Sequence, residues 1–536
     1  MIFLSISFVC YFFLLTFLGK FLYEYIFDFF KFEKSKKIFS LNLETFLPLV
    51  SLFVLANLSI MINFLFNLRY FHLFLFLIFL FLFNKYRRHT ISIFNQHFRY
   101  NYMKSIVIPI VLSVALVDLD FNYDAGLYNL KYQQFLLNHK ILINGYIFDN
   151  SFGLTQIGDY LSSIHIFNQN YIYSYFPNLV IYTVFFNTLY EFITSKERYF
   201  FYIAVPVLIY GILDNFGLEG GRNGFIYIEN LGKIDMSFAI LFFIGGVLLF
   251  KLFSENFHQD SNLFISLMFI FFSAQYRITG YLLIITAILY ILKNKNFINF
   301  KIIKFFSVLF SVWLIRNLLL TSCFVYPVDF LCFNNNLIIR NFRDMVFEYN
   351  RAYHLGDNLS SWFNEWFNVS LSRRISINFI LTVTVLFVVR YIFFNKLVKN
   401  FRWPYIFFIT YLTIWFFGSP DFRFLSGLML LSISFIYLNY ELKEKFAFLK
   451  NNTLIHTIFL LCLIFTIRVP SYKNYSTQIV DQKILTVTKV NLAKRVDGFY
   501  RPEIGDQCWA SINCTTANYK FANKDIFGYL IFEKID

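Results

Sequence analysis

Three aspartates stand close together directly after an apolar stretch. Asp118, Asp120 and Asp124 lie in the run Val-Asp-Leu-Asp-Phe-Asn-Tyr-Asp-Ala-Gly-Leu-Tyr. A carboxylate at the end of a membrane helix is costly unless water, a cation or a substrate compensates its charge. One interpretation is that the three residues only mark the exit of a helix. Their density beside Tyr123 and Gly126 favours a second one, in which a carboxylate acts as a general base and removes a proton from a hydroxyl group.

A second polar segment is rich in glycine and carries one arginine. It reads Leu-Glu-Gly-Gly-Arg-Asn-Gly-Phe, from Leu218 to Phe225, with the guanidinium on Arg222. Backbone N–H groups of such a loop, together with a guanidinium, are suited to binding a phosphate. The segment lacks the Gly-Lys-Ser/Thr of a nucleotide-binding P-loop, which excludes that type of site. A plain flexible turn is the alternative, and the sequence leaves both open.

Two further arginines lie beside apolar stretches. Arg316 and Asn317 end one stretch, and Arg423 follows Asp421 in Ser-Pro-Asp-Phe-Arg-Phe. The planar fork of a guanidinium matches a phosphate or carboxylate. The alternatives are that Arg423 pairs with Asp421 and that the Arg316 side chain reaches toward lipid headgroups.

The elements that must position these residues are membrane-spanning helices. Of 536 residues 58% are hydrophobic and 15% charged, with a mean hydropathy of +0.57, which excludes a soluble enzyme and a disordered chain. A bilayer core of about 30 Å needs roughly 20 apolar residues per helix. This criterion predicts an all-α polytopic protein with about fourteen (12–14) spans, near residues 1–19, 43–66, 68–84, 104–117, 174–194, 199–215, 236–252, 261–276, 278–292, 303–320, 375–395, 403–418, 423–440 and 453–468. The stretch 261–292 is either a hairpin or one interrupted helix.

The net charge of +15 predicts an orientation rather than a nucleic-acid partner. Basic residues cluster after alternate spans, in segments 20–37, 85–104, 293–304, 396–402 and 443–450, and the positive-inside rule makes these segments cytoplasmic. The predicted transmembrane domain, 1–468, then has long outer loops at 118–173, 216–235 and 321–373. Residues 469–536 form a small extracytoplasmic segment. Because the polar residues gather in the outer loops, the predicted site lies on the outer face of the membrane, which in a bacterium faces the periplasm or cell exterior.

Four of six cysteines fall in the predicted outer segments. Cys323, Cys332, Cys508 and Cys514 lie there, where an oxidising compartment permits disulfides. The simplest pairs are Cys323–Cys332 and Cys508–Cys514, although four cysteines allow three pairings. No CxxC and no paired histidine supports a metal site. We therefore predict no metal ligands and no cofactor, and leave open a divalent cation.

The tail from residue 469 is too small to hold much core of its own. Its Lys483–Thr488 stretch partly alternates like a strand, and a Cys508–Cys514 bridge would constrain its end. We expect the tail to pack over the outer cavity as a cap.

The order of several short motifs resembles that of a family of bacterial membrane proteins associated with surface-polysaccharide genes and distantly similar to GT-C glycosyltransferases. The run Tyr123–Tyr128 is similar to the family's Tyr-Asp-Thr-Gly-Leu-Tyr-His, with Asn129 in place of the histidine. Arg316-Asn317 followed by Tyr326-Pro327 resembles a second family run. The remaining matches are Pro420–Phe424, close to Pro-Asp-x-Arg-Phe, and the tail run of Asp506–Trp509 with Cys514-Thr515, similar to a closing Cys-Trp and Cys-Thr motif.

This resemblance implies a GT-C-like fold in which outer loops form a cavity open to the membrane. It implies a transferase that takes a sugar from a polyprenyl-phosphate carrier and passes it to a glycan acceptor during surface polysaccharide or glycoconjugate synthesis. Asp124 would be the catalytic carboxylate, with Asp118 and Asp120 behind it. The substrate-binding residues would be Tyr123, Tyr128, Arg222, Arg316, Asn317, Asp421 and Arg423, with the arginines on the carrier phosphate.

Two other functions fit the same layout. A polysaccharide polymerase or ligase also combines many spans with a large outer loop and arginines. A transporter or flippase of lipid-linked saccharides would show ionisable residues in mid-membrane, for which Arg277 is the nearest candidate. Membrane lipid is an expected partner in every case, and nucleic acid in none.

Overall fold

The computed structural model describes residues 1–71, 102–166, 169–195, 197–215, 228–254, 259–295, 298–328, 331–333, 358–368, 402–418, 424–435, 452–465, 469–478, 483–487 and 490–535, with a few single positions between them. The fold is mostly helical. Its main helices are α1 (Ile2–Phe30), α2 (Leu47–Asn63), α4 (Ile108–Ser113), α5 (Leu130–Asn138), α6 (Gly145–Phe148), α7 (Ile157–Ser163), α8 (Phe176–Thr194), α9 (Arg198–Asn215), α10 (Asp235–Ser254), α11 (Asp260–Tyr276), α12 (Tyr281–Lys293), α13 (Phe300–Thr321), α15 (Leu359–Asn368), α17 (Arg402–Gly418), α18 (Ser426–Phe435), α19 (Asn452–Phe465) and α20 (Val469–Thr477).

Three helices are long and apolar enough to cross a membrane, namely α1, α10 and α13. Four shorter apolar stretches accompany them, at Leu47–Asn63, Tyr199–Leu208, Ile278–Lys293 and Ile406–Phe416. These helices support a membrane protein, as the composition predicts. The described residues contain three helices of this length, so the predicted number of about fourteen spans is not shown. The span at 375–395 and most of the one at 68–84 lie outside the described residues.

From α10 to α13, helices that follow one another in the chain run in alternate directions. The rings of Phe264 and Phe305 pack near the starts of α11 and α13, and Phe271 packs on Phe310 farther along both, so these two helices are parallel. Helix α12 returns beside α10, since Tyr290 near its end packs on Phe253 near the end of α10. The stretch 261–292 is therefore a hairpin rather than one interrupted helix.

The helix ends separate into two groups. At one end, which we call the basic end, the ion pairs Lys104–Glu191 and Lys251–Glu197 tie together helix ends that are distant in sequence. At the other, the loop end, Ser5 bonds Tyr475 and Leu231 N–H donates to the carbonyl of Asp120. In these contacts, described residues from segments predicted to share a side of the membrane lie at the same end of the molecule.

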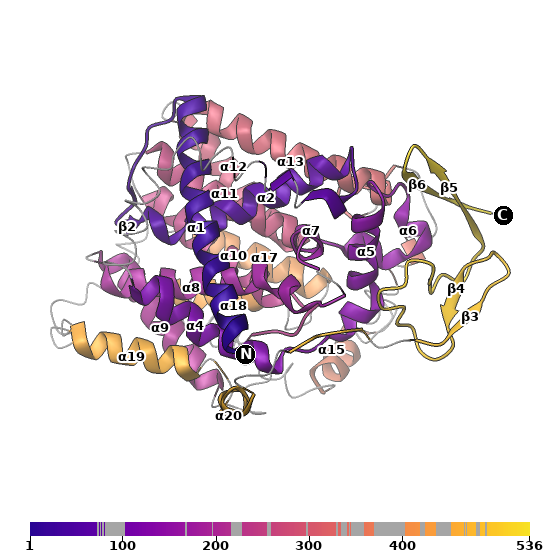
Figure 1. Ribbon diagram of the computed structural model, residues 1–536. Helices are drawn as coiled ribbons and strands as arrows, with labels where there is room; N and C mark the ends of the chain where they lie inside the picture. The colour runs from indigo at the N-terminus through magenta and orange to yellow at the C-terminus, as the bar shows by residue number, and fades with distance from the viewer. Residues whose placement is uncertain are drawn as a thin grey trace.

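The strands form three antiparallel two-stranded ladders. β1 (Lys37–Ile38) pairs with β2 (Leu41–Asn42) at the basic end, whereas β3 (Leu492–Lys494) with β4 (Tyr500–Pro502) and β5 (Phe521–Ile526) with β6 (Tyr529–Lys534) belong to the tail. Figure 1 shows the two tail hairpins beside α5 and α6, on the side of the molecule opposite β2. The predicted strand at Lys483–Thr488 is wrong over its described part. Residues 483–487 join no sheet, because Leu485 instead bonds the Asn170 side chain and the Tyr171 backbone.

The tail packs on the first long loop. Ile143 N–H donates to the carbonyl of Leu530 at 3.0 Å, and Phe532 N–H returns to the Ile143 carbonyl at 3.1 Å. Beneath this contact the rings of Phe148, Phe521 and Phe532 form one buried cluster. The tail thus obtains from the loop the core that it is too short to build alone.

Candidate functional site

The Tyr123–Gly126 segment is hydrogen-bonded to the tail. The Tyr123 hydroxyl donates to the Asp506 carboxylate, and Trp509 N–H donates to the Gly126 carbonyl at 2.8 Å. A Cβ on Gly126 would stand 3.0 Å from both the Gln507 side chain and the Trp509 ring, so any other residue here would require these side chains to shift. Two motifs that the sequence separates by more than 380 positions therefore meet.

The opposite side of the same segment rests on residues 228–235. Asn122 N–H donates to the Leu231 carbonyl at 2.8 Å, and Asn129 Nδ2 donates to the Gly232 carbonyl at 2.7 Å. Gly232 has a φ of +91° and lies against Ala125, where a side chain would collide. The segment carrying Asp124 is thus held from two sides.

The three candidate carboxylates lie in different surroundings. Asp124 is half-buried, and among the described residues its carboxylate has no hydrogen-bond partner. Asp120 is exposed, and within the described part of the chain its carboxylate accepts one hydrogen bond, from the N–H of the adjacent Phe121 at 2.7 Å. Asp124 is therefore the carboxylate whose oxygens remain available within a fixed segment.

Asp118 is bound to the tail through both carboxylate oxygens, by the Ser471 hydroxyl and by Nδ2 of Asn474 at 2.8 Å. The Lys483 ammonium donates to the backbone carbonyls on either side of Asp118, at 2.5 and 2.6 Å. Burial lowers the pKa of Lys483, while the charges of Asp118 and Asp120 oppose that shift. Asp118 therefore joins the tail to the end of a helix.

Arg316 lies buried among neutral oxygen atoms, with 1% of its surface exposed. Its five N–H groups contact Tyr160 OH (3.4 Å), the Thr155 carbonyl (3.4 Å), Asn317 Oδ1 (2.9 Å), Tyr132 OH (2.6 Å) and Thr155 Oγ1 (2.5 Å). No carboxylate of the described residues forms an ion pair with it. The guanidinium braces α13 against α5 and α7, and leaves no N–H group for a phosphate.

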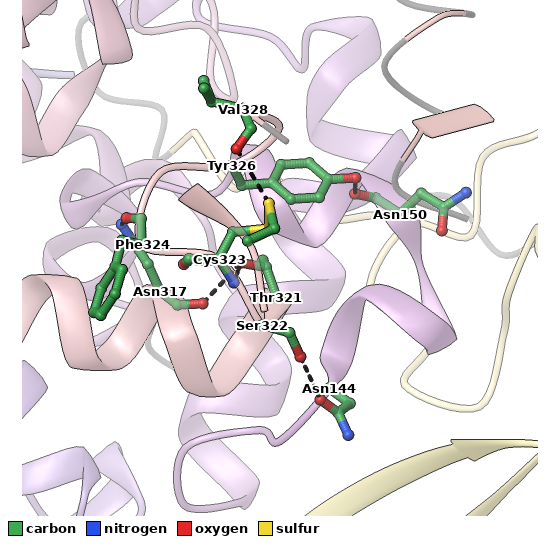
Figure 2. Close-up of a disulfide and its surroundings, with 10 residues drawn as sticks. Asn144, Asn150, Asn317, Thr321, Ser322, Cys323, Phe324, Tyr326 and Val328 are labelled. Carbon is green, nitrogen blue, oxygen red and sulfur yellow. Dashed lines mark hydrogen bonds between the residues drawn. A yellow bond between two sulfur atoms is a disulfide. The ribbon is translucent and has the colours of Figure 1, made fainter. Parts of the chain in front are cut away.

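Asn317 extends this brace to the loop closed by Cys323 and Cys332. Its Nδ2 donates to the Phe324 carbonyl at 3.3 Å, and the Tyr326 hydroxyl donates to the Asn150 carbonyl at 3.1 Å (Figure 2). The structure contains both disulfides named above, Cys323–Cys332 and Cys508–Cys514. Each disulfide closes a short loop within one segment, and hydrogen bonds from these loops reach residues 118–173.

The structure describes only some of the remaining residues that were predicted to bind substrate. Tyr123 is exposed and Tyr128 is buried. Arg222, Asp421 and Arg423 lie outside the described residues. The neighbouring Phe424 is described, and its ring lies 4.6 Å from the Arg277 guanidinium carbon.

Arg277 itself stands at the end of helix α11. It forms an ion pair with Asp235, the first residue of α10, two residues after Lys233 and close to the Leu231–Gly232 contact with the Asp124 segment. The end of the 419–424 segment and the 228–235 segment therefore meet at the loop end.

The sequence analysis missed several buried charged groups, and three of them are Lys131, Asp149 and Asp159. Lys131 and Asp149 form a buried ion pair under the tail, where Lys131 Nζ also donates to the Cys514 carbonyl at 3.3 Å. Asp159 caps α7 by accepting from Gln156 N–H at 2.9 Å, and burial raises its pKa to about 6. The Gln156-x-x-Asp159 spacing of a capping box was a usable signal. No sequence signal indicated that Lys131 is buried, because a lysine at the start of a helix is usually exposed.

Within the described part of the chain, no three histidine, cysteine or carboxylate side chains gather as a metal site. Comparison with protein-family models, with curated proteins and with solved structures found no match to this chain.

Proposed function

We propose that the chain is a GT-C-like glycosyltransferase with about fourteen spans in the bacterial inner membrane. It transfers a sugar from a polyprenyl-phosphate carrier to a glycan acceptor at the extracytoplasmic face. The observation that carries this proposal is Asp124, a carboxylate with free oxygens among the described residues on a segment held by Gly232 on one side and Trp509 on the other.

The proposed step uses Asp124 as the general base. The acceptor hydroxyl oxygen bonds to the anomeric carbon while the bond from that carbon to the phosphate oxygen breaks. The hydroxyl proton passes to Asp124, and the electron pair leaves with the polyprenyl phosphate. A base held in place contributes about 10²–10⁴-fold to such a rate.

The other residues divide by their contacts. Arg316 and Asn317 position the loop end, because their polar groups are engaged within the protein. Binding of the carrier phosphate is accordingly assigned to Arg222 and Arg423. Tyr123 positions Asp124 through its contact with Asp506.

The test is Asp124→Asn in cells whose only copy of the gene carries the change. The amide has nearly the shape of the carboxylate but cannot accept the proton. We expect wild-type protein levels and a surface glycan that lacks one sugar of its repeat unit. Glu503→Gln, at an exposed tail carboxylate without a side-chain bond in the described structure, is the matched control and should leave the glycan unchanged.

The same experiment separates the alternatives. A complete repeat unit with shortened chains would indicate a polymerase or ligase. Complete lipid-linked units that accumulate on the cytoplasmic side would indicate a flippase. A wild-type glycan in the Asp124→Asn strain would remove Asp124 from the mechanism.

A further inference from the structure

The tail hairpin β5–β6 ends in an exposed apolar tip. Phe527 occupies the turn with a φ of 55° and is 89% exposed, and Ile526 beside it is also exposed. Burial of a large aromatic side chain is favourable, so an outward-facing phenylalanine at a turn is costly in water.

The tip is held against the segments that follow α5 and α2. Lys140 N–H donates to the Gly528 carbonyl at 3.3 Å, and Lys140 Nζ donates to the Phe527 carbonyl at 2.6 Å. On the other strand, the Tyr529 hydroxyl donates to the Phe64 carbonyl at 2.5 Å. The position of the tip relative to the helix bundle is therefore fixed by three hydrogen bonds.

The chain at this end of α2 is itself apolar and exposed. Leu65 and Phe66 are each 61% exposed, and Tyr70 follows. Exposed apolar residues then recur three positions apart at Phe74, Leu77 and Leu80, which is the spacing of one helix face. In a membrane protein such a face contacts lipid, and the tip lies at its end.

Amphipathic side chains border the tip. The Lys140 ammonium lies 4.7 Å from the centre of the Tyr529 ring, and Arg69 is exposed on the adjoining turn. Lysine, arginine and tyrosine gather where the apolar core of a bilayer meets its headgroups. The tip is apolar and is bordered by basic and aromatic side chains. This arrangement matches a lipid surface better than it matches a protein interface, whose rim is polar.

We propose that the Ile526–Phe527 tip inserts into the lipid leaflet at the loop end and anchors the tail there. The inference does not depend on the proposed transferase activity. It gives the tail a second attachment, so that the contacts of Asp506 and Trp509 with the Asp124 segment lie at a fixed depth relative to the membrane.

The test measures depth with a nitroxide spin label on the full chain in phosphatidylethanolamine–phosphatidylglycerol vesicles. Cys10 and Cys462, the free cysteines, are first replaced by serine. Phe527→Cys is then labelled and compared with Val496→Cys and Ile504→Cys, which are 93% and 91% exposed in the same tail but make no described contact with α2. Collision rates with oxygen, which enriches in lipid, and with a water-soluble nickel chelate are recorded.

We expect the ratio of oxygen to nickel collisions to be severalfold higher at 527 than at 496 and 504. Equal ratios at the three positions would overturn the proposal. Strong dipolar coupling between labels at 527 at high lipid-to-protein ratio would also overturn it, since the tip would then bind a second copy. Phe527→Asp gives an independent measurement, in which proteolysis of the tail should accelerate in vesicles but not in detergent.

Discussion

Replacing Lys131 with methionine tests whether the tail is held by a buried charge pair. Lys131 and Asp149 are both buried, and Lys131 also donates to Cys514 in the tail and lies over the rings of Phe148 and Phe152. Methionine keeps the apolar contact with both rings but leaves Asp149 charged and unpaired. Removing one partner of a buried pair costs about 3–5 kcal/mol.

The assay is amide hydrogen exchange of the purified protein in detergent, followed in residues 145–154 and 508–517. Each 1.4 kcal/mol is about tenfold in an opening equilibrium, so exchange there should accelerate on the order of 10² to 10³-fold. Lys524→Met is the matched control. Its partner Glu533 is exposed, and a surface pair contributes about 0–1 kcal/mol.

A second variant isolates the charge. Asp149→Asn combined with Lys131→Met removes both charges, and the asparagine oxygen can still accept from Ser151 N–H as Asp149 does at 2.9 Å. We expect the double variant to exchange far more slowly than the single lysine variant. If the double variant instead shows the sum of the two single effects, the ion pair is not what holds the tail, and the reasoning is refuted.

Two further predictions concern the same end of the molecule. Since burial raises the pKa of Asp159 from 3.8 to about 6, the folded state binds this proton more tightly than the unfolded state, and stability falls as pH rises through this window, by roughly 3 kcal/mol. Thermal midpoints between pH 4 and 7 should show this fall in the wild type and not in Asp159→Asn, and parallel curves would contradict it. Gly153→Ala places a Cβ 2.3 Å from the Tyr326 ring, so we expect a loss of about 1–3 kcal/mol, seen as a lower thermal midpoint. Ser151→Ala, two residues away, is the control, and an equal midpoint in both variants would show that the ring moves freely.

The arrangement of the described helices followed closely from the sequence. Apolar length located α1, α10 and α13, and the alternation of basic loops predicted which helix ends share a side, as the Lys104–Glu191 and Lys251–Glu197 pairs show. The number of spans was harder to predict from the sequence. Short helices such as α4 and those of the α11–α12 hairpin are apolar, but each is too short to be identified as a membrane span by its length.

The candidate site could be predicted only as a set of segments. Residue type alone does not separate Asp118, Asp120 and Asp124, yet the Asp118 carboxylate is hydrogen-bonded to the tail, whereas no described residue hydrogen-bonds the Asp124 carboxylate. Arg316 has the residue type of a phosphate ligand, yet Tyr132 and Thr155 occupy its N–H groups. Both differences arise from side chains that approach from other helices.

The sequence by itself therefore predicted a mostly helical chain with apolar helices able to cross a membrane, and assigned its basic and its polar segments to opposite sides. Hydropathy and charge are local properties, and the bilayer acts on each segment separately. Only the tertiary structure decided that the Trp509 loop clasps Gly126, that Arg316 is internally satisfied and that Phe527 lies beside the end of α2. Those contacts join segments far apart in the chain, and their partners are selected by the packing of the whole fold.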